Sequence, residues 1–155
     1  MSEAVDPATY ARAWERATAL LKRRQAASSL GLGVNTALLA AISFIARSDT
    51  LTPVFRGLAA ALLMIAGIAA CDLWRRSLLD YQRLMAWWYD RLRVLEEAMP
   101  RADRLASAEY EALYAPGSAK VGLTRHELRL IVVLSSLHVA FTALTFGAAA
   151  LGEGG

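Results

Sequence analysis

Cysteine and histidine are scarce in this chain of 155 residues, and their scarcity excludes several kinds of chemistry. The single cysteine, Cys71, cannot form an intramolecular disulfide, and with only two histidines beside it a zinc site is very difficult to build. The sequence also lacks a glycine-rich phosphate loop, a nucleophile elbow and a paired-histidine metal motif. We therefore expect a protein that is not an enzyme, with no catalytic residue, no bound metal and no cofactor.

Charge is absent from three long stretches: Gln25–Ala46, Gly57–Cys71 and Leu130–Gly152 contain no Asp, Glu, Lys or Arg. The first and third, with 22 and 23 residues, exceed the length of about 20 residues that crosses a bilayer. The second has 15 residues and reaches 21 when it is extended back to Leu51, with Arg56 snorkelling to the interface. The pattern predicts an all-α integral membrane protein with three transmembrane helices, in preference to a soluble helical bundle.

Basic residues are distributed unevenly around these stretches. Five precede the first stretch and ten lie between the second and the third, whereas the turn between the first two has only Arg47 and the nearby Arg56. The positive-inside rule then predicts a multi-pass protein of the cytoplasmic (inner) membrane, with a cytoplasmic N-terminus and central segment. We interpret the net charge of +3 as this topology signal and as a match to the lipid bilayer, and we expect no nucleic-acid partner.

Helix start and stop signals divide the chain into segments. Asp6 and Pro7 supply an N-cap and a first helical residue, and Thr52 and Pro53 repeat the signal. Because a tight turn joins the first two spans, we predict that their charged extensions form a cytoplasmic antiparallel helical hairpin, whose second arm ends at Pro100. The single membrane domain 1–155 then comprises a cytoplasmic helix 7–24, the spans 25–46 and 51–71, an amphipathic cytoplasmic helix 72–99, a cytoplasmic linker helix 104–114 and the span 128–151.

The amphipathic helix 72–99 carries the most regular pattern in the chain. Eight apolar residues alternate at spacings of four and three, the 3.5-residue period of a helix–helix seam. We favour this packing role over a stacking platform for a ligand. The helix 7–24 is the natural partner but is shorter than the seam, so we expect the remaining apolar surface to contact a neighbouring copy in a homo-oligomer. These oligomer and seam residues are Trp74, Leu78, Tyr81, Met85, Trp88, Leu92, Leu95 and Met99.

Polar residues inside the predicted spans are the other candidates for function. Asn35 and Thr36 lie near the middle of the first span, and His138 lies in the third. An unpaired amide or imidazole is costly in hydrocarbon, so these side chains should face protein or water. For Asn35 the alternatives are an interhelical hydrogen bond, which we favour, and a pore or ligand contact. For His138 they are a packing partner and a titratable group such as a proton-linked gate.

Short segments spread between Tyr10 and about Phe141 carry a resemblance to a known family. They are Tyr10, Arg23–Ala26, Val34–Leu39, Cys71–Trp74, Ser77–Leu84, Val94–Pro100, Glu109-Tyr110 and Leu123-Thr124 with Glu127. Together they resemble the RipA-type octameric membrane proteins of bacteria, with departures at Met85, Met99 and Tyr110. The resemblance implies a cytoplasmic-membrane homo-octamer with no established catalytic activity. A looser similarity links the chain to small bacterial membrane effectors that perforate or depolarise membranes.

These observations lead to two competing expectations of function. One is a non-enzymatic homo-oligomeric inner-membrane assembly that acts as a scaffold or stress-linked complex and docks a cytoplasmic protein partner. The other is a gated pore or membrane-perturbing effector under the control of such a partner. A membrane-bound enzyme is a third class, supported only by the clustered charges of Glu96, Glu97 and Arg83.

Overall fold

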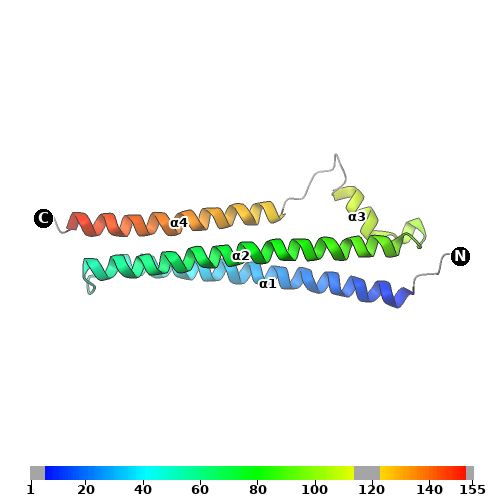
Figure 1. The fold of residues 1–155 in the computed structure, drawn as a ribbon, viewed down its shortest axis with the longest axis horizontal. Helices are drawn as coiled ribbons and strands as arrows, with labels where there is room; N and C mark the ends of the chain where they lie inside the picture. The colour runs from blue at the N-terminus through cyan, green and yellow to red at the C-terminus, as the bar shows by residue number, and fades with distance from the viewer. Residues whose placement is uncertain (1–5, 114–122, 153–155) are drawn as a thin grey trace. The chain divides into compact units, whose positions relative to one another are not determined.

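The computed structural model describes residues 6–113 and 123–152, and in these ranges the chain consists of helices joined by short turns, with no strand. Three helices, α1, α2 and α4, are long and apolar enough to cross a membrane. This confirms the predicted all-α class and the three candidate transmembrane helices; the cytoplasmic side of the hairpin stays a prediction. The elements, drawn in Figure 1, are α1 (Pro7–Ala46), α2 (Pro53–Glu96), the short 3₁₀ helix η1 (Arg101–Asp103), α3 (Leu105–Leu113) and α4 (Leu123–Gly152).

The helix starts follow the sequence signals. The Asp6 carboxylate accepts hydrogen bonds from the Ala8 N–H at 3.1 Å and from the Thr9 hydroxyl at 3.2 Å, which caps α1. At α2 the Arg56 N–H donates to the Thr52 carbonyl at 3.0 Å, with Pro53 as the first helical residue.

The helix ends differ from the predicted ones. α2 ends at Glu96 and not at Met99, and a turn in which the Met99 N–H donates to the Glu96 carbonyl at 2.9 Å precedes Pro100. The residue before a proline is disfavoured in the helical conformation, so the helix closes early. α3 spans Leu105–Leu113 in place of 104–114, of which residue 114 lies outside the described residues. α4 runs from Leu123 to Gly152 and contains the predicted span 128–151.

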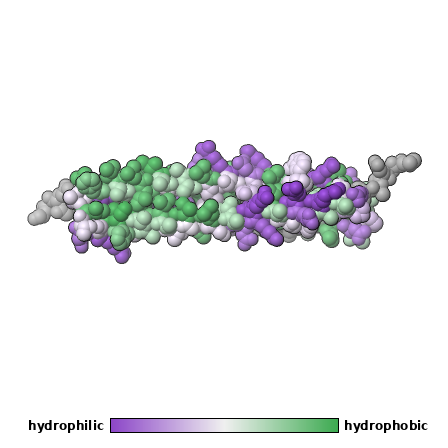
Figure 2. All heavy atoms as spheres, turned by 90° about the horizontal axis from the view of Figure 1, so that it is seen from below, coloured by the Kyte–Doolittle hydropathy of each residue, from purple (hydrophilic) through white to green (hydrophobic). Residues whose placement is uncertain are grey.

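The chain divides into two compact units, and α1 and α2 contribute residues to both. The first unit comprises residues 1–26 and 78–125, and the second comprises residues 27–77 and 126–155. On the face drawn in Figure 2, hydrophilic residues predominate over the first unit and hydrophobic residues over the second. The second unit therefore holds the uncharged stretches, and the first holds most of the charged helical segments.

Each unit has its own core. In the first, alanines of α1 lie against leucines of α2 and a residue of α3, and this small-to-large pairing brings the helices close; the buried members are Ala13, Ala17, Leu92, Leu95 and Ala106. In the second, α1, α2 and α4 lie side by side (Figure 1), and the core includes Ile42, Ala60, Trp74, Ile131 and Leu134. Exposed apolar side chains are abundant on the second unit, as expected of helices that face lipid or other transmembrane helices.

Candidate functional site

Two buried polar clusters, one in each unit, are the candidate functional sites. In the second unit, Asn35 of α1, Cys71 of α2 and His138 of α4 converge, with exposed fractions of 0%, 2% and 0%. The Asn35 Oδ1 atom accepts a hydrogen bond from the Cys71 thiol at 3.1 Å and lies 3.1 Å from the His138 Nε2 atom. One amide therefore joins all three helices of this unit.

The hydrogen bonds determine which atoms of the Asn35 amide and the His138 imidazole donate and which accept. The Asn35 Nδ2 atom donates to the Gly31 carbonyl at 2.8 Å, so the opposite atom of the amide, Oδ1, is the shared acceptor. Because an amide oxygen cannot donate, His138 must carry its proton on Nε2. Its Nδ1 atom is then a buried acceptor, and it has no hydrogen-bond partner among the residues that the structure describes. The cluster is thus held together by neutral groups, as suits an apolar surrounding.

Two glycines make room for the large side chains around this cluster. A Cβ atom added at Gly67 would lie only 2.3 Å from the His138 ring, and one added at Gly31 would lie 2.5 Å from the Trp74 ring. No atom lies within 4 Å of a Cβ added at Gly33. The α2 backbone therefore approaches α4 closely at Gly67, and this approach lets the imidazole reach the amide of Asn35.

The structure treats the three predicted intramembrane polar residues differently. It brings Asn35 and His138 together between helices, whereas Thr36 is exposed and its hydroxyl donates to the Leu32 carbonyl of its own helix at 2.9 Å. Neither Asn35 nor His138 lies on a surface of the single chain, so the pore alternative rests on a rearrangement or on other residues. Cys71, considered above only for a disulfide or a zinc site, is the missed member; its place one helical turn before the buried Trp74 is the signal in the sequence.

The first unit contains a cluster of a different kind, centred on Glu96. This carboxylate is 0% exposed. Its Oε1 atom accepts hydrogen bonds from the Tyr10 hydroxyl at 2.7 Å and the Ala106 N–H at 2.7 Å. Its Oε2 atom accepts from the N–H and the hydroxyl of Ser107, at 2.8 and 2.7 Å. Glu96 therefore caps the first turn of α3, where backbone N–H groups have no partner within the helix and the helix dipole favours a negative charge.

These contacts shift the ionisation of both partners. Burial raises the pKa of Glu96, but the hydrogen bonds from Tyr10, from the Ser107 side chain and from the two backbone N–H groups outweigh burial and leave the pKa below its ordinary value. Burial also raises the pKa of the Tyr10 hydroxyl, and the bond to the negative carboxylate raises it further. Glu96 is thus held as an anion and Tyr10 as a neutral donor.

Arg104 completes a reciprocal arrangement between α2 and α3. Its Nε atom donates to the Met99 carbonyl and its Nη2 atom to the Glu97 carbonyl, both at 2.9 Å. The residue that precedes α3 thus binds carbonyls just beyond α2, while Glu96 at the end of α2 binds the N–H groups of α3. The two helix ends stabilise each other, and Glu97, the sequence neighbour of Glu96, is exposed.

Seven of the eight predicted seam residues lie on the less exposed side of α2, and the eighth, Met99, lies just beyond the end of this helix. Trp74, Leu78, Leu92 and Leu95 are buried, and the other four, Tyr81, Met85, Trp88 and Met99, are half-buried. The large apolar side chains left exposed in this part of α2 belong to another face, with Leu84, Trp87 and Val94 at 43%, 58% and 53% exposure. Along this face Trp87 and Val94 line a shallow groove of about 420 Å³ together with Asp90 and Arg91.

The contacts of the two clusters described above hold the helices together. Among the described residues, no three side chains of the His, Cys, Asp and Glu types come together as a metal site. The ion pairs of α2 join residues three or four positions apart on its surface. The arrangement can join helices, cap a helix and present apolar surface to lipid or to other chains.

This fold and these clusters define a helical membrane protein in which buried polar groups join the helices. The model of the octameric membrane protein family (8xMP) matches residues 7–147, and the chain belongs to that family. This match confirms the resemblance found in the motifs and supports self-association as the chain's mode of assembly. No curated protein and no solved structure matches the chain.

Proposed function

We propose that this protein is a non-enzymatic scaffold of the bacterial inner membrane, an octamer whose charged helices form a cytoplasmic docking surface for a protein partner. The observation that carries the proposal is how the buried polar groups are used. Glu96, the one buried carboxylate of the described residues, has four internal donors, and Asn35 joins three helices. These buried polar groups are thus occupied in holding the chain together.

The exposure of the apolar residues of α2 supports a particular contact between copies. Leu92 and Leu95 of the predicted seam are covered within one chain, so they offer a neighbour little surface. Leu84, Trp87 and Val94 are exposed on a segment outside the uncharged stretches, where water would otherwise meet them. Asp90 and Arg91 flank the groove between them with charges of both signs, which suits a contact between identical chains. We call Leu84, Trp87 and Val94 the outer stripe, and we assign it to the contact with a neighbouring copy.

The mass of the detergent-solubilised particle tests this assignment. Trp87→Glu is expected to weaken assembly by about 30-fold or more, since an interface tryptophan contributes about 2 kcal/mol or more. Gln82→Glu is the matched control, because it adds the same charge at an exposed position on another side of α2. An unchanged particle mass for Trp87→Glu would contradict the outer stripe as the contact between copies, and a pull-down with the intact octamer would still test the docking of a partner.

A gated pore is the second candidate function. Thr36 favours it, because this polar residue of the first uncharged stretch is exposed on α1 and a ring of copies could place it along a central passage. Reconstitution in liposomes separates the two functions. Ion flux that depends on Thr36, measured with Thr36→Val against the unchanged protein, would support the pore; an octamer that stays impermeable with its cytoplasmic partner bound supports the scaffold.

A further inference from the structure

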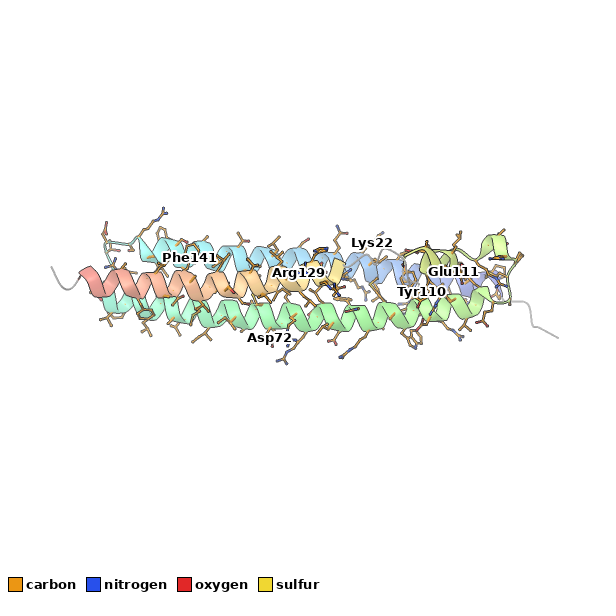
Figure 3. All side chains as sticks on the ribbon, turned by 90° about the horizontal axis from the view of Figure 1, so that it is seen from above. Lys22, Asp72, Tyr110, Glu111, Arg129 and Phe141 are labelled. Atoms are coloured by element: carbon orange, nitrogen blue, oxygen red, sulfur yellow. The ribbon has the colours of Figure 1, made fainter. Side chains whose placement is uncertain are left out.

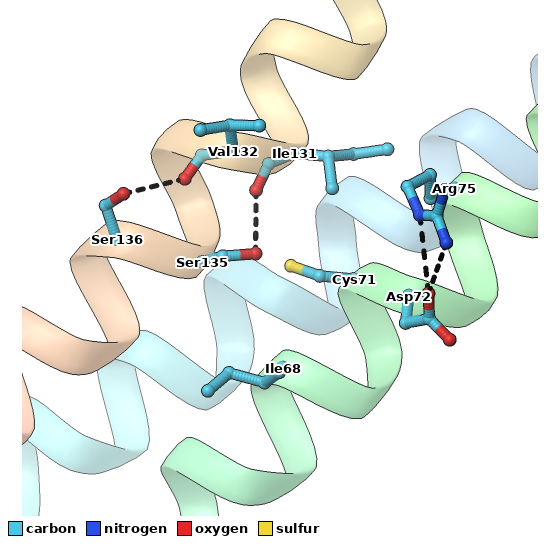
Figure 4. Close-up of a pocket in the computed structure, with 8 residues that line it drawn as sticks. All are labelled: Ile68, Cys71, Asp72, Arg75, Ile131, Val132, Ser135 and Ser136. Carbon is cyan, nitrogen blue, oxygen red and sulfur yellow. Dashed lines mark hydrogen bonds and ion pairs between the residues drawn. The ribbon is translucent and has the colours of Figure 1, made fainter.

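A groove between α2 and α4 of the second unit has features of a lipid site. Its volume is about 280 Å³, just under the range of about 300–1,000 Å³ that holds compact drug-sized ligands. Ile68 of α2 and Ile131 and Val132 of α4 form its apolar walls, and Asp72 and Arg75 lie at one end (Figure 4). A narrow apolar groove with charge at one end has the shape and polarity of a site for a single acyl chain below its head group.

The polar atoms along the groove are already satisfied. The Ser135 hydroxyl donates to the Ile131 carbonyl at 2.9 Å, and the Ser136 hydroxyl donates to the Val132 carbonyl at 3.0 Å (Figure 4). The Cys71 thiol is directed to the Asn35 amide, as described above. A hydrocarbon chain in the groove would therefore leave none of these groups without a partner, which removes the main penalty for apolar contact with a polar wall.

The charged end of the groove carries an excess of positive charge. The Asp72 carboxylate, on the outer side of α2 (Figure 3), accepts hydrogen bonds from Arg75 at 3.0 and 3.3 Å and forms an ion pair with Arg76 at 2.6 Å. The bond from Arg75, followed by that from Arg76, lowers the pKa of Asp72, so its charge is retained. Two guanidinium groups thus share one carboxylate. Both are at least half exposed and keep N–H groups for another acceptor.

The position of this charged end matches the surface of a bilayer. Asp72 follows directly on the second uncharged stretch, and Arg129, labelled in Figure 3, directly precedes the third. The groove therefore begins where both helices change from charged to apolar residues. Phospholipid phosphates lie at this depth, and basic pockets between transmembrane helices bind anionic head groups.

We propose that the α2–α4 groove binds an anionic phospholipid, with one acyl chain against Ile68, Ile131 and Val132 and the phosphate at Arg75 and Arg76. The proposal rests on the membrane location but not on the scaffold role or on the outer stripe. Lipid binding could therefore fail while the octamer and its docking function persist, and the reverse also holds.

Native mass spectrometry of the detergent-solubilised octamer tests the site. With phosphatidylglycerol and phosphatidylcholine of equal chain length, we expect tighter binding of the anionic lipid. Arg75→Ala should reduce this preference about five-fold, the effect of about 1 kcal/mol for each basic residue near an anionic surface. Arg83→Ala is the matched control: Arg83 pairs with Asp80 at the same i,i+3 spacing as Arg75 with Asp72, but it does not line the groove.

A second variant tests the apolar half. Ser136→Phe should fill the groove and reduce the binding of both lipids, with particle mass and thermal unfolding as checks that the protein is intact. Equal binding of the two lipids, or equal loss in Arg75→Ala and Arg83→Ala, would overturn the proposal. So would displacement of the lipid by inorganic phosphate alone, which would indicate an anion site without a chain. A change in particle mass with Arg75→Ala and no lipid bound would assign the groove to a contact between copies and would also overturn it.

Discussion

The two units bury polar side chains by opposite means. In the first unit a charged group, Glu96, is buried, and four donors together with the N-terminus of α3 compensate its charge. In the second unit the buried groups are neutral, and Asn35 shares one oxygen between a thiol and an imidazole. The difference follows from the surroundings: an ion can be buried where helix ends supply free N–H groups, whereas within apolar helices every backbone donor is already used. Burial of a charged side chain is also costly within a bilayer.

The largest effect is expected from removal of the charged cluster. Glu96→Ala leaves the donors of Tyr10, Ala106 and Ser107 without an acceptor, and each such group costs about 1–3 kcal/mol. We expect the first unit to lose about 3 kcal/mol or more of stability and α3 to lose its protection from hydrogen exchange. Glu97→Ala is the control, since this neighbour is exposed and only its backbone carbonyl is used. Equal exchange in both variants would contradict the role of Glu96 as the cap of α3.

A smaller effect is expected from crowding the neutral cluster. Gly67→Ala places a methyl group on the His138 ring, and overpacking of this kind costs about 1–3 kcal/mol. The control is Gly33→Ala, where a Cβ meets no atom within 4 Å of the position. Thermal unfolding in detergent should separate the two variants. If both are as stable as the unchanged protein, the close approach of α2 to α4 at Gly67 is not required.

The sequence is sufficient to predict the helices but not the contacts that join them. The absence of charge marks the three apolar helices, and Asp6-Pro7 and Thr52-Pro53 mark two helix starts, because these signals are local. Asn35 and His138 were each identifiable as costly polar residues. Their pairing was not, because 103 positions separate them and the contact depends on the backbone approach at Gly67.

The Glu96 cluster was beyond sequence reasoning for the same reason. Tyr10 lies 86 positions away, and the N-terminus of α3 reaches the carboxylate only after the turn at Pro100 has formed. Arg104 also acts only after this turn has formed, because it binds the carbonyls of Glu97 and Met99, which lie beyond the end of α2. Local signals therefore predict elements, and contacts between distant residues decide where the polar groups go.

Loss of the shared acceptor in the second unit should cost less than loss of Glu96. Asn35→Leu removes the oxygen that Cys71 and His138 use, and hydrogen bonds between transmembrane helices contribute about 1 kcal/mol each. We expect a modest decrease in thermal stability and an intact octamer. Thr36→Val is the matched control for thermal stability, because that hydroxyl bonds only to its own helix. Loss of ion flux in Asn35→Leu with unchanged stability would favour the pore over the helix-joining role.

The ionisation of Glu96 and Tyr10 is expected to have the smallest effect on stability at neutral pH. It also gives the clearest distinction between the two units. Because the folded pKa of Glu96 lies below its ordinary value of 4.5, the unfolded chain binds the proton more readily, and the stabilisation is lost as pH falls from 4.5 through the folded value. The raised pKa of Tyr10 has the opposite sign: its contribution is complete below pH 10 and is lost as pH rises through the folded value. Hydrogen exchange of α3 followed against pH should show both losses in the unchanged protein. Glu96→Gln should abolish the acidic loss, and Tyr10→Phe the alkaline one. An acidic loss that persists in Glu96→Gln would mean that another group controls α3, and the contrast between a charged and a neutral cluster would then no longer explain how the first unit is stabilised.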